Sequence, residues 1–194
     1  MKLMSKTPVL DKGWVALYSA SLMRDDFAQV LRSNFRGTID NRITDMAQVI
    51  LSIRCPLFVQ LTFSEYGLSS SSEKIGGATE AYIPDVSAIN AQDLETSQAI
   101  QQDIEATTEA LLINPQAYQH DNCDLFIAQV ISPISIYNTL MVYGSLTSWT
   151  RYIEQKSLPR PIEAYRAAIE SCLNSEWSSV ITAIRHGNGT KKKS

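Results

Sequence analysis

The chain has 194 residues, 44% of them hydrophobic, and a formal net charge of −3. This length and composition are typical of one globular domain with its own core, and two domains would be crowded. The acidic balance excludes a whole-protein positive field that attracts nucleic acid. The one basic run is three lysines at residues 191–193, in a stretch that is typical of a solvated tail.

The chain contains no apolar run of the roughly 20 residues that a membrane-spanning helix needs. No apolar stretch follows Lys2 and Lys6, as it would in a secretory signal. The cysteines Cys55, Cys123 and Cys172 sit among apolar neighbours and lack metal-like spacing. We therefore expect no membrane partner, reduced thiols in the core and a cytoplasmic location.

The first third of the chain predicts a strand, two helices and a second strand. Residues 9–18 mix apolar and polar side chains as a strand does, and acidic residues precede a short helix at 27–33. Residues 41–53 have helical spacing, and Pro56 ends that helix. Residues 57–64 alternate between an apolar and a partly polar face, which predicts a half-buried strand.

The middle of the chain predicts a loop and a long helix. Residues 67–77 contain four consecutive serines and two adjacent glycines, which are typical of a surface loop. The helix that follows residues 84–89 is expected to end at Ile113, because Asn114 and Pro115 come next. Its apolar stripe consists of Leu94, Ile100, Ile104 and Leu111.

The last third predicts a helix at 123–131, a strand at 135–145 and a helix at 146–155. Pro161 lies in the first turn of another helix, and a final helix follows Ser175. The apolar face of the helix that begins near Pro161 consists of Ile162, Tyr165, Ile169 and Cys172. Few strands among many helices indicate an α+β fold with a small sheet.

Residues 1–6 are expected to be a flexible N-terminus, residues 7–186 one domain, and residues 187–194 a flexible basic tail. Chemical motifs are scarce within that domain. His120 and His186 have no second ligand at zinc spacing, and the chain has no phosphate-binding glycine loop and no G-x-S-x-G serine.

Five short motifs, in order, resemble the flavin-dependent thymidylate synthases. Residues 9–15 resemble the opening strand V-L-D-x-G-x-V, and residues 56–59 resemble P-[IL]-F-V. Residues 82–84 resemble the aromatic-apolar-proline exit from the ligand loop, and residues 133–137 resemble L-P-L-S-x-Y. Arg166 falls where the arginine of E-I-R lies in the family. The motifs span most of the chain, and their specificity comes from order and spacing.

The resemblance implies a thymidylate-synthase-like domain with a small antiparallel sheet flanked by long helices. It also implies a homotetramer with sites at subunit interfaces, and FAD and a reduced folate as cofactors if the family activity is retained. In the family, flavin carries the hydride and folate carries the carbon that convert dUMP to dTMP, so the protein supplies no nucleophile. We therefore assign no catalytic residue and no metal ligand.

The ligand-binding signature of the family, R-H-R, is missing. An ungapped alignment places Glu65, Tyr66 and Gly67 on its three positions, and Leu61 and Gly77 on flanking arginines. Guanidinium groups bind phosphates through forked, charge-assisted hydrogen bonds worth about 1.5–3 kcal/mol each. Glu65 also places a negative charge where the family binds anions.

Other positions keep groups that can bind a ligand. Ser70 and Glu73 match the serine and glutamate inside the signature, and Arg166 is the one matched cation. The candidate ligand-binding residues are Thr62, Ser64, Glu65, Ser70, Glu73 and Arg166. The alternative for Arg166 is an ordinary ion pair with Glu163 or Glu170 at helical spacing.

Three hypotheses follow. The chain is a diverged homologue that does not perform standard dUMP methylation and has a remodelled cleft for a nucleotide or nucleoside. Alternatively, it is an active flavin- and folate-dependent thymidylate synthase with a rearranged site. The third is a non-catalytic oligomeric interaction protein on the same scaffold, with the serine loop and the helix at 90–113 as contact surfaces.

Overall fold

The computed structural model of the chain describes residues 5–20, 41–72, 80–89, 93–120, 134–156 and 158–190. Their strands form one five-stranded sheet in the order β1-β2-β3-β5-β4, and every neighbouring pair is antiparallel. The strands are β1 (Thr7–Val9), β2 (Gly13–Ala20), β3 (Gln48–Pro56), β4 (Ser69–Ser72) and β5 (Tyr137–Ser145). The predicted α+β class with a small antiparallel sheet is confirmed.

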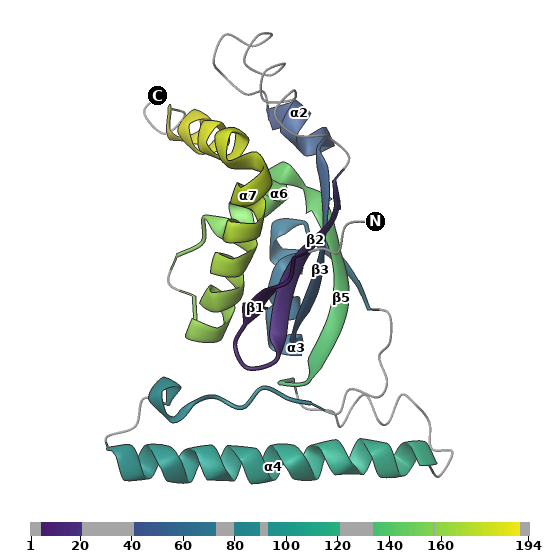
Figure 1. The fold of residues 1–194 in the computed structure, drawn as a ribbon, viewed down its shortest axis with the longest axis vertical. Coiled ribbons are helices and arrows are strands. Elements are labelled where there is room, and N and C mark those ends of the chain that lie inside the picture. Colours follow the sequence, from purple (N-terminus) through teal and green to yellow (C-terminus); the bar gives the residue numbers. More distant parts are fainter. Residues whose placement is uncertain are drawn as a thin grey trace.

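Helices α3 (Leu57–Phe63), α6 (Leu146–Ile153) and α7 (Arg160–Thr190) lie on one side of this sheet (Figure 1). The short α2 (Asn41–Met46) lies at one end of the strands, and the long α4 (Leu94–His120) crosses the other end. Two 3-10 turns, η1 (Ser64–Tyr66) and η2 (Val86–Ala88), follow α3 and precede α4. None of the helices in these described ranges is long and apolar enough to cross a membrane.

The core lies between the sheet and α3, α6 and α7. Val15, Ile53 and Leu140 form one fully buried row across β2, β3 and β5. The helices cover this face with large side chains: Phe63, Trp149, Tyr152, Tyr165, Ile169 and Leu173 are all fully buried. Burial of this size is the main stabilising contribution in a domain of this kind.

The predicted helix at 41–53 is wrong beyond its first turns. The chain forms α2 and then β3, whose alternate residues Val49, Leu51, Ile53 and Cys55 are buried. Apolar residues in this stretch match both a helical and an alternating pattern. The strand forms because β2 and β5 pair with it on both sides, and β-branched side chains suit a strand.

The predicted strand at 57–64 is also wrong, because this segment is α3 followed by η1. Pro56 directly precedes the first helical residue. Proline has no backbone N–H, and N–H groups at the start of a helix have no partner within the helix, so a proline costs nothing there. Val59 and Phe63 are buried one helical turn apart, while Leu61 is 60% exposed. Both edges of β3 are already paired, so this segment has no place beside it.

The predicted serine loop begins with an edge strand. Ser69–Ser72 form β4, which pairs with residues 140–143 of β5. Three of its four serines are exposed, so no hydrophobic signal marked the strand. Residues 73–79, which complete the predicted loop and include Glu73, lie outside the described residues.

Helix α4 does not end at Ile113 but continues through Asn114 and Pro115 to His120. The strand at 135–145 and the helix at 146–155 are confirmed as β5 and α6. The two predicted C-terminal helices join in α7, which has non-helical angles at Trp177 (φ −133°, ψ 30°) and enters the predicted tail. The helices predicted at 27–33 and 123–131 lie outside the described residues.

Candidate functional site

Residues of four family-like motifs, and Tyr165 beside Arg166, lie together at the end of the sheet that faces α4. Asp11 and Gly13 come from the turn into β2, Tyr137 from the start of β5, and Tyr165 from α7. The Tyr137 hydroxyl donates to the Asp11 carboxylate at 2.5 Å, and the Tyr165 hydroxyl donates to the carbonyl of Arg54 at 2.8 Å. The Tyr137 hydroxyl therefore joins the motifs at 9–15 and 133–137, and the Tyr165 hydroxyl, beside Arg166, reaches β3 two residues before the motif at 56–59.

The remaining two motifs join the same end through backbone hydrogen bonds. The amides of Leu57 and Phe58 donate to the carbonyls of Ile136 and Ile134, each at 3.0 Å. The amide of Tyr82 donates to the Ser135 carbonyl at 2.9 Å. The rings of Phe58 and Tyr82 then pack edge to face, with centroids 5.9 Å apart. The P-L-F-V and Y-I-P motifs are thus held on opposite sides of the segment that opens β5.

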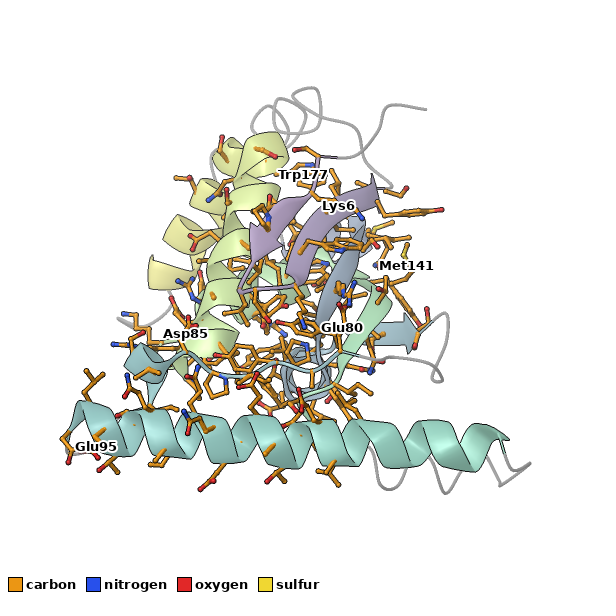
Figure 2. The ribbon with its side chains drawn as sticks, turned by 60° about the horizontal axis from the view of Figure 1, so that its bottom comes forward. Lys6, Glu80, Asp85, Glu95, Met141 and Trp177 are labelled. Atoms are coloured by element: carbon orange, nitrogen blue, oxygen red, sulfur yellow. The ribbon has the colours of Figure 1, made fainter. Side chains whose placement is uncertain are left out.

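An ion pair completes this cluster. Arg54, on β3, pairs with Glu80, and its guanidinium lies over the Tyr137 ring at 5.6 Å from the centroid. Figure 2 shows Glu80 and Asp85 between this end of the sheet and α4. We define the sheet-end cluster as Asp11, Arg54, Glu80, Tyr137 and Tyr165.

The tyrosines of the sheet-end cluster are hydrogen-bond donors and not bases. Burial raises the pKa of Tyr137 far above its ordinary value, and the hydrogen bond to Asp11 raises it further. Burial likewise raises the pKa of Tyr165, with a smaller contribution from Cys55. Both phenols stay protonated near neutral pH, and both already donate within the protein. The cluster therefore positions the motifs and leaves neither hydroxyl for proton transfer.

The predicted ligand segment lies on α3, η1 and β4. The Thr62 hydroxyl donates to the Val59 carbonyl at 2.7 Å, and the Ser64 hydroxyl donates to the Leu61 carbonyl at 3.1 Å. Both bonds close onto the preceding turn of the same helix, as serine and threonine often do. Glu65 is exposed and is the only charged side chain among these described elements.

Ser70 joins this segment through one contact. On exposed β4, its hydroxyl accepts a hydrogen bond from the Gln60 side chain at 3.3 Å. The predicted residues Thr62, Ser64, Glu65 and Ser70 therefore occupy neighbouring elements.

Arg166 lies on α7 with its side chain 17% exposed, and all its described contacts are internal. Its Nε and Nη2 donate to the two carboxylate oxygens of Glu163 at 2.8 and 2.6 Å. Its Nη1 donates to Glu170 at 2.9 Å and to the Ile153 carbonyl at 2.6 Å. The ion pairs predicted for Arg166 at helical spacing are present with both Glu163 and Glu170, and Ile153 of α6 is a further partner.

Tyr152 is the link between Arg166 and the predicted segment. Burial raises the Tyr152 pKa, while the nearby Thr62 hydroxyl and the Arg166 charge act to lower it. Its ring contacts Phe63 and Tyr66 with centroids 5.3 and 5.4 Å apart. Among the described residues, the fully buried Tyr152 hydroxyl has no hydrogen bond of normal geometry. The Tyr152 ring, packed against Phe63 and Tyr66, therefore lies near both Arg166 and Thr62.

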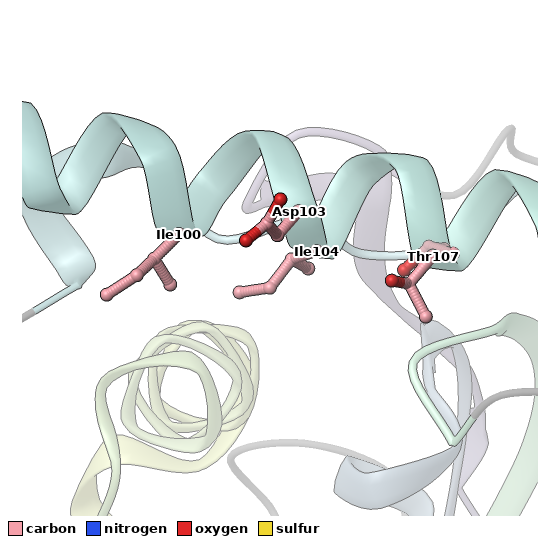
Figure 3. A pocket seen from close by; sticks show the side chains of 5 residues that line it. Ile100, Asp103, Ile104 and Thr107 are labelled. Atoms are coloured by element: carbon pink, nitrogen blue, oxygen red, sulfur yellow. The ribbon is translucent and has the colours of Figure 1, made fainter.

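A groove of about 310 Å³ lies along α4, lined by Ile100, Asp103, Ile104, Thr107 and Thr108. Figure 3 shows Ile100, Ile104 and Thr107 on the side of α4 that faces the rest of the domain. Gln101 donates to the Pro84 carbonyl at 3.0 Å, and Ser97 donates to the Ile89 carbonyl at 3.2 Å. The groove is open and mainly apolar, and Asp103 gives it a negative charge that disfavours phosphate.

Sequence reasoning missed the sheet-end cluster as a unit. Asp11 and Tyr137 were noted as parts of motifs, but no pattern indicated that their side chains form a pair. Arg54 and Glu80 form the ion pair of the cluster, and neither was singled out. No group of three or more histidine, cysteine, aspartate or glutamate side chains that could hold a metal occurs among the described residues.

Comparison with known proteins gives no assignment: no protein-family model matches this chain, and no curated protein matches it. The fold and the contacts therefore define its class only as a small antiparallel α+β domain with a long helix across one end of its sheet.

Proposed function

We propose that the chain is a diverged homologue of the flavin-dependent thymidylate synthases that does not perform standard dUMP methylation. It keeps the scaffold and has a remodelled cleft for a less anionic, nucleoside-like ligand near α3, η1 and β4. The observation that carries the proposal is the state of Arg166. The one cation that matches the family motifs is bound by two carboxylates and a carbonyl.

The charge around Arg166 supports the proposed loss of phosphate binding. Two carboxylates, from Glu163 and Glu170, accompany one guanidinium, so these three side chains carry a net charge of −1 (+1 − 2). Nε and Nη2 of the Arg166 guanidinium already form a bidentate pair with the Glu163 carboxylate. A phosphate would need the same two donors for a bidentate pair. A phosphate would have to displace a carboxylate and approach a second one.

The contacts between four of the motifs support the scaffold part of the proposal. The motifs at 9–15, 56–59, 82–84 and 133–137 meet through Asp11–Tyr137 and the backbone bonds of residues 134–136, and Tyr165 bonds to the Arg54 carbonyl beside them. The loss of arginines affects the ligand segment, while the converging motifs have structural roles. A scaffold can therefore persist while its binding groups change.

An active synthase that uses FAD and a reduced folate is the alternative. It would need cationic groups to hold two phosphorylated ligands, and the described parts of α3, η1 and β4 carry only Glu65. The homotetramer that the resemblance implies and the cytoplasmic location expected from the apolar setting of the cysteines are retained as parts of the proposal. The non-catalytic interaction protein, with the serine loop and the helix at 90–113 as its contact surfaces, is the second alternative.

Purified full-length protein tests the proposal. We expect it to be colourless, without the visible absorption bands of a bound flavin. We expect deoxyuridine to raise the unfolding temperature, and dUMP and FAD at the same concentration to leave it unchanged. Bound flavin, or stabilisation by dUMP that exceeds that by deoxyuridine, would overturn the proposal in favour of the active synthase. If none of the three compounds raises the unfolding temperature, the ligand-cleft part of the proposal is wrong.

A further inference from the structure

The part of the chain that carries α4 leaves the sheet and returns to it at one place. Ala81 forms a β-bridge with Ile136, and the amide of Tyr82 donates to the Ser135 carbonyl at 2.9 Å. The chain therefore departs after Tyr82 and is back beside it at Ser135. We define the arm as the described residues between these two points, 83–89 and 93–120, which form η2 and α4. Because the arm begins and ends at one place, it can move without breaking the pairing of the strands.

Helix α4 crosses the sheet end (Figure 1) but buries very little of its own surface. Among its described side chains, at residues 94–112, only Ser97 and Thr108 are buried, and both are polar. Leu94 is 67% exposed and Ile100 is 38% exposed. A helix in a protein usually gains most of its stability from an apolar face that packs against the core. This stretch of α4 has no buried apolar side chain, so its packing holds it only weakly.

The hydrogen bonds of α4 hold the arm together and do not tie it to the sheet. The Ser97 hydroxyl donates to the Ile89 carbonyl at 3.2 Å, and the Gln101 side chain donates to the Pro84 carbonyl at 3.0 Å. Both acceptors lie at the two sides of η2, within the arm itself. Helix α4 and η2 are therefore bonded to each other and are expected to move as one body.

One side-chain hydrogen bond between described residues joins the arm to the helices of the domain. Nη1 of Arg160, the first residue of α7, donates to the Ser87 carbonyl of η2 at 3.1 Å. The described part of the arm contains acidic residues and neither lysine nor arginine, so it has no cation of its own for an ion pair. Glu105 and Glu109 of α4 are four residues apart and repel each other. Arg160 is therefore the cation that faces this acidic body, and its contact is exposed, where such contacts are weak.

We infer that the arm is a lid over the sheet end, which swings open as one body about Ile83, with the Arg160–Ser87 bond as its latch. Tyr82, on one side of this hinge, is fixed to Ser135, and η2 and α4 on the other side are fixed to each other. Opening uncovers the end of the sheet where Glu80 and the rest of the sheet-end cluster lie (Figure 2). The lid goes beyond the proposed function and depends neither on the ligand cleft nor on the oligomeric state.

The test is the rate of thiol alkylation in the full-length protein, followed peptide by peptide by mass spectrometry. Thr108 is 7% exposed and lies one turn beyond Ile104, on the side of α4 that faces the domain. We expect the thiol of Thr108→Cys to react at least about 100-fold faster than the native Cys55, which is fully buried on β3 and needs the core to open. Ser97→Cys faces η2 within the arm, so it should stay covered and react at least about tenfold more slowly than Thr108→Cys. Ile104→Cys is the second reporter if circular dichroism shows that Thr108→Cys does not fold.

The latch is tested by adding Arg160→Ala to Thr108→Cys, which should speed alkylation of the new thiol about two- to fivefold and leave Cys55 unchanged. Arg151→Ala is the matched control, because Arg151 is exposed on α6 and its loss makes the same charge change.

Three results would overturn the lid. Equal rates for Thr108→Cys and Cys55 would mean that α4 opens only with the core. Equal rates for Thr108→Cys and Ser97→Cys would mean that α4 unfolds locally and does not swing as one body. Equal effects of Arg160→Ala and Arg151→Ala would mean that the bond to Ser87 is not the latch.

Discussion

The hydroxyl of Tyr165 occupies the space that a side chain at Gly13 would fill. A Cβ added to Gly13 would lie 1.8 Å from the Tyr165 hydroxyl oxygen, and that hydroxyl donates to the Arg54 carbonyl. The contact explains why a glycine stands in the V-L-D-x-G-x-V motif: it allows α7 to approach the turn between β1 and β2. It also makes this pair a sensitive test of the sheet-end cluster.

We predict that Gly13→Ala lowers the free energy of unfolding by about 2–4 kcal/mol. The new methyl group must displace a buried hydroxyl, and both the overpacking and the lost hydrogen bond contribute. Urea unfolding measures the effect. Gly144→Ala is the control, because the nearest atom there is the end of the flexible Leu68 side chain, and it should cost less.

A double-mutant cycle isolates the contact itself. In the Tyr165→Phe background the hydroxyl is gone, so Gly13→Ala should cost less than it does in wild type. Equal costs in the two backgrounds would show that the Gly13–Tyr165 contact does not limit this position. The neighbouring Val9 carbonyl, at 2.8 Å from the added Cβ, would then be the cause.

Tyr137→Phe should lower the free energy of unfolding by about 1–3 kcal/mol. The change removes the donor to Asp11 while the ring still packs, and hydrogen bonds to charged groups are the stronger kind. Tyr143→Phe, at an exposed tyrosine on the same strand, is the control and should change the free energy little. Equal stabilities of Tyr137→Phe and wild type would mean that the Asp11 pair contributes nothing net.

Stability should fall steeply in alkali. The pKa values of Tyr137, Tyr152 and Tyr165 are raised above 10.0, chiefly by burial. A raised folded-state pKa means that the unfolded chain loses these protons first. The contribution of the protonated tyrosines to the free energy of unfolding is fully present below pH 10 and is lost as the pH rises toward the folded-state pKa values. Above pH 10 each tyrosine lowers the free energy of unfolding by about 1.4 kcal/mol per pH unit.

Urea unfolding at several pH values between about 8 and 11 measures this slope. Tyr165→Phe should reduce the slope by the share of one tyrosine. A slope that is unchanged in this variant would mean that Tyr165 ionises equally well in the folded and unfolded chain.

Arg166→Ala should lower the free energy of unfolding by about 1–2 kcal/mol, because it removes the fork to Glu163 and the bond to the Ile153 carbonyl. Arg166→Lys should recover only part of this loss, since an ammonium cannot form the bidentate pair. The hydrogen bond from Arg166 lowers the Glu163 pKa, so the contribution of the pair is present above the unfolded-state pKa. The penalty of Arg166→Ala should therefore shrink as the pH falls through the folded-state pKa. A penalty that is independent of pH would contradict this assignment.

Glu65→Arg should create measurable affinity for dUMP. The substitution replaces the repelling carboxylate with a guanidinium at the first position of the R-H-R alignment, and one such contact is worth roughly 1.5–3 kcal/mol, or about tenfold or more in affinity. Isothermal titration with dUMP and deoxyuridine measures it. Glu95→Arg makes the same charge change on α4 and should have no such effect. If both variants gain equally, the gain reflects net charge, and η1 is not part of the ligand cleft.

The amino-acid sequence alone determined those parts of the fold whose local pattern allows one interpretation. Residues 137–145 include Thr139, Val142 and two tyrosines and form β5. Pro161 and the stripe through Tyr165 and Ile169 predict the start of α7 correctly. The alternation of few strands with many helices was enough for the α+β class. The Arg166 pairs were predictable as well, because residues three and four apart on a helix are neighbours.

Only the tertiary structure decided the segments whose pattern fits both a helix and a strand. Residues 48–56 form β3 because β2 and β5 pair with both its edges, and α3 is helical because no sheet edge remains beside it. The serines of β4 carry no hydrophobic signal, so their strand exists through backbone pairing with β5 alone. The sheet-end cluster joins Asp11 to Tyr137, and Tyr165 of the cluster also packs against Gly13, each across more than 100 residues. No local pattern encodes contacts over that separation, because they form only when the whole sheet is assembled.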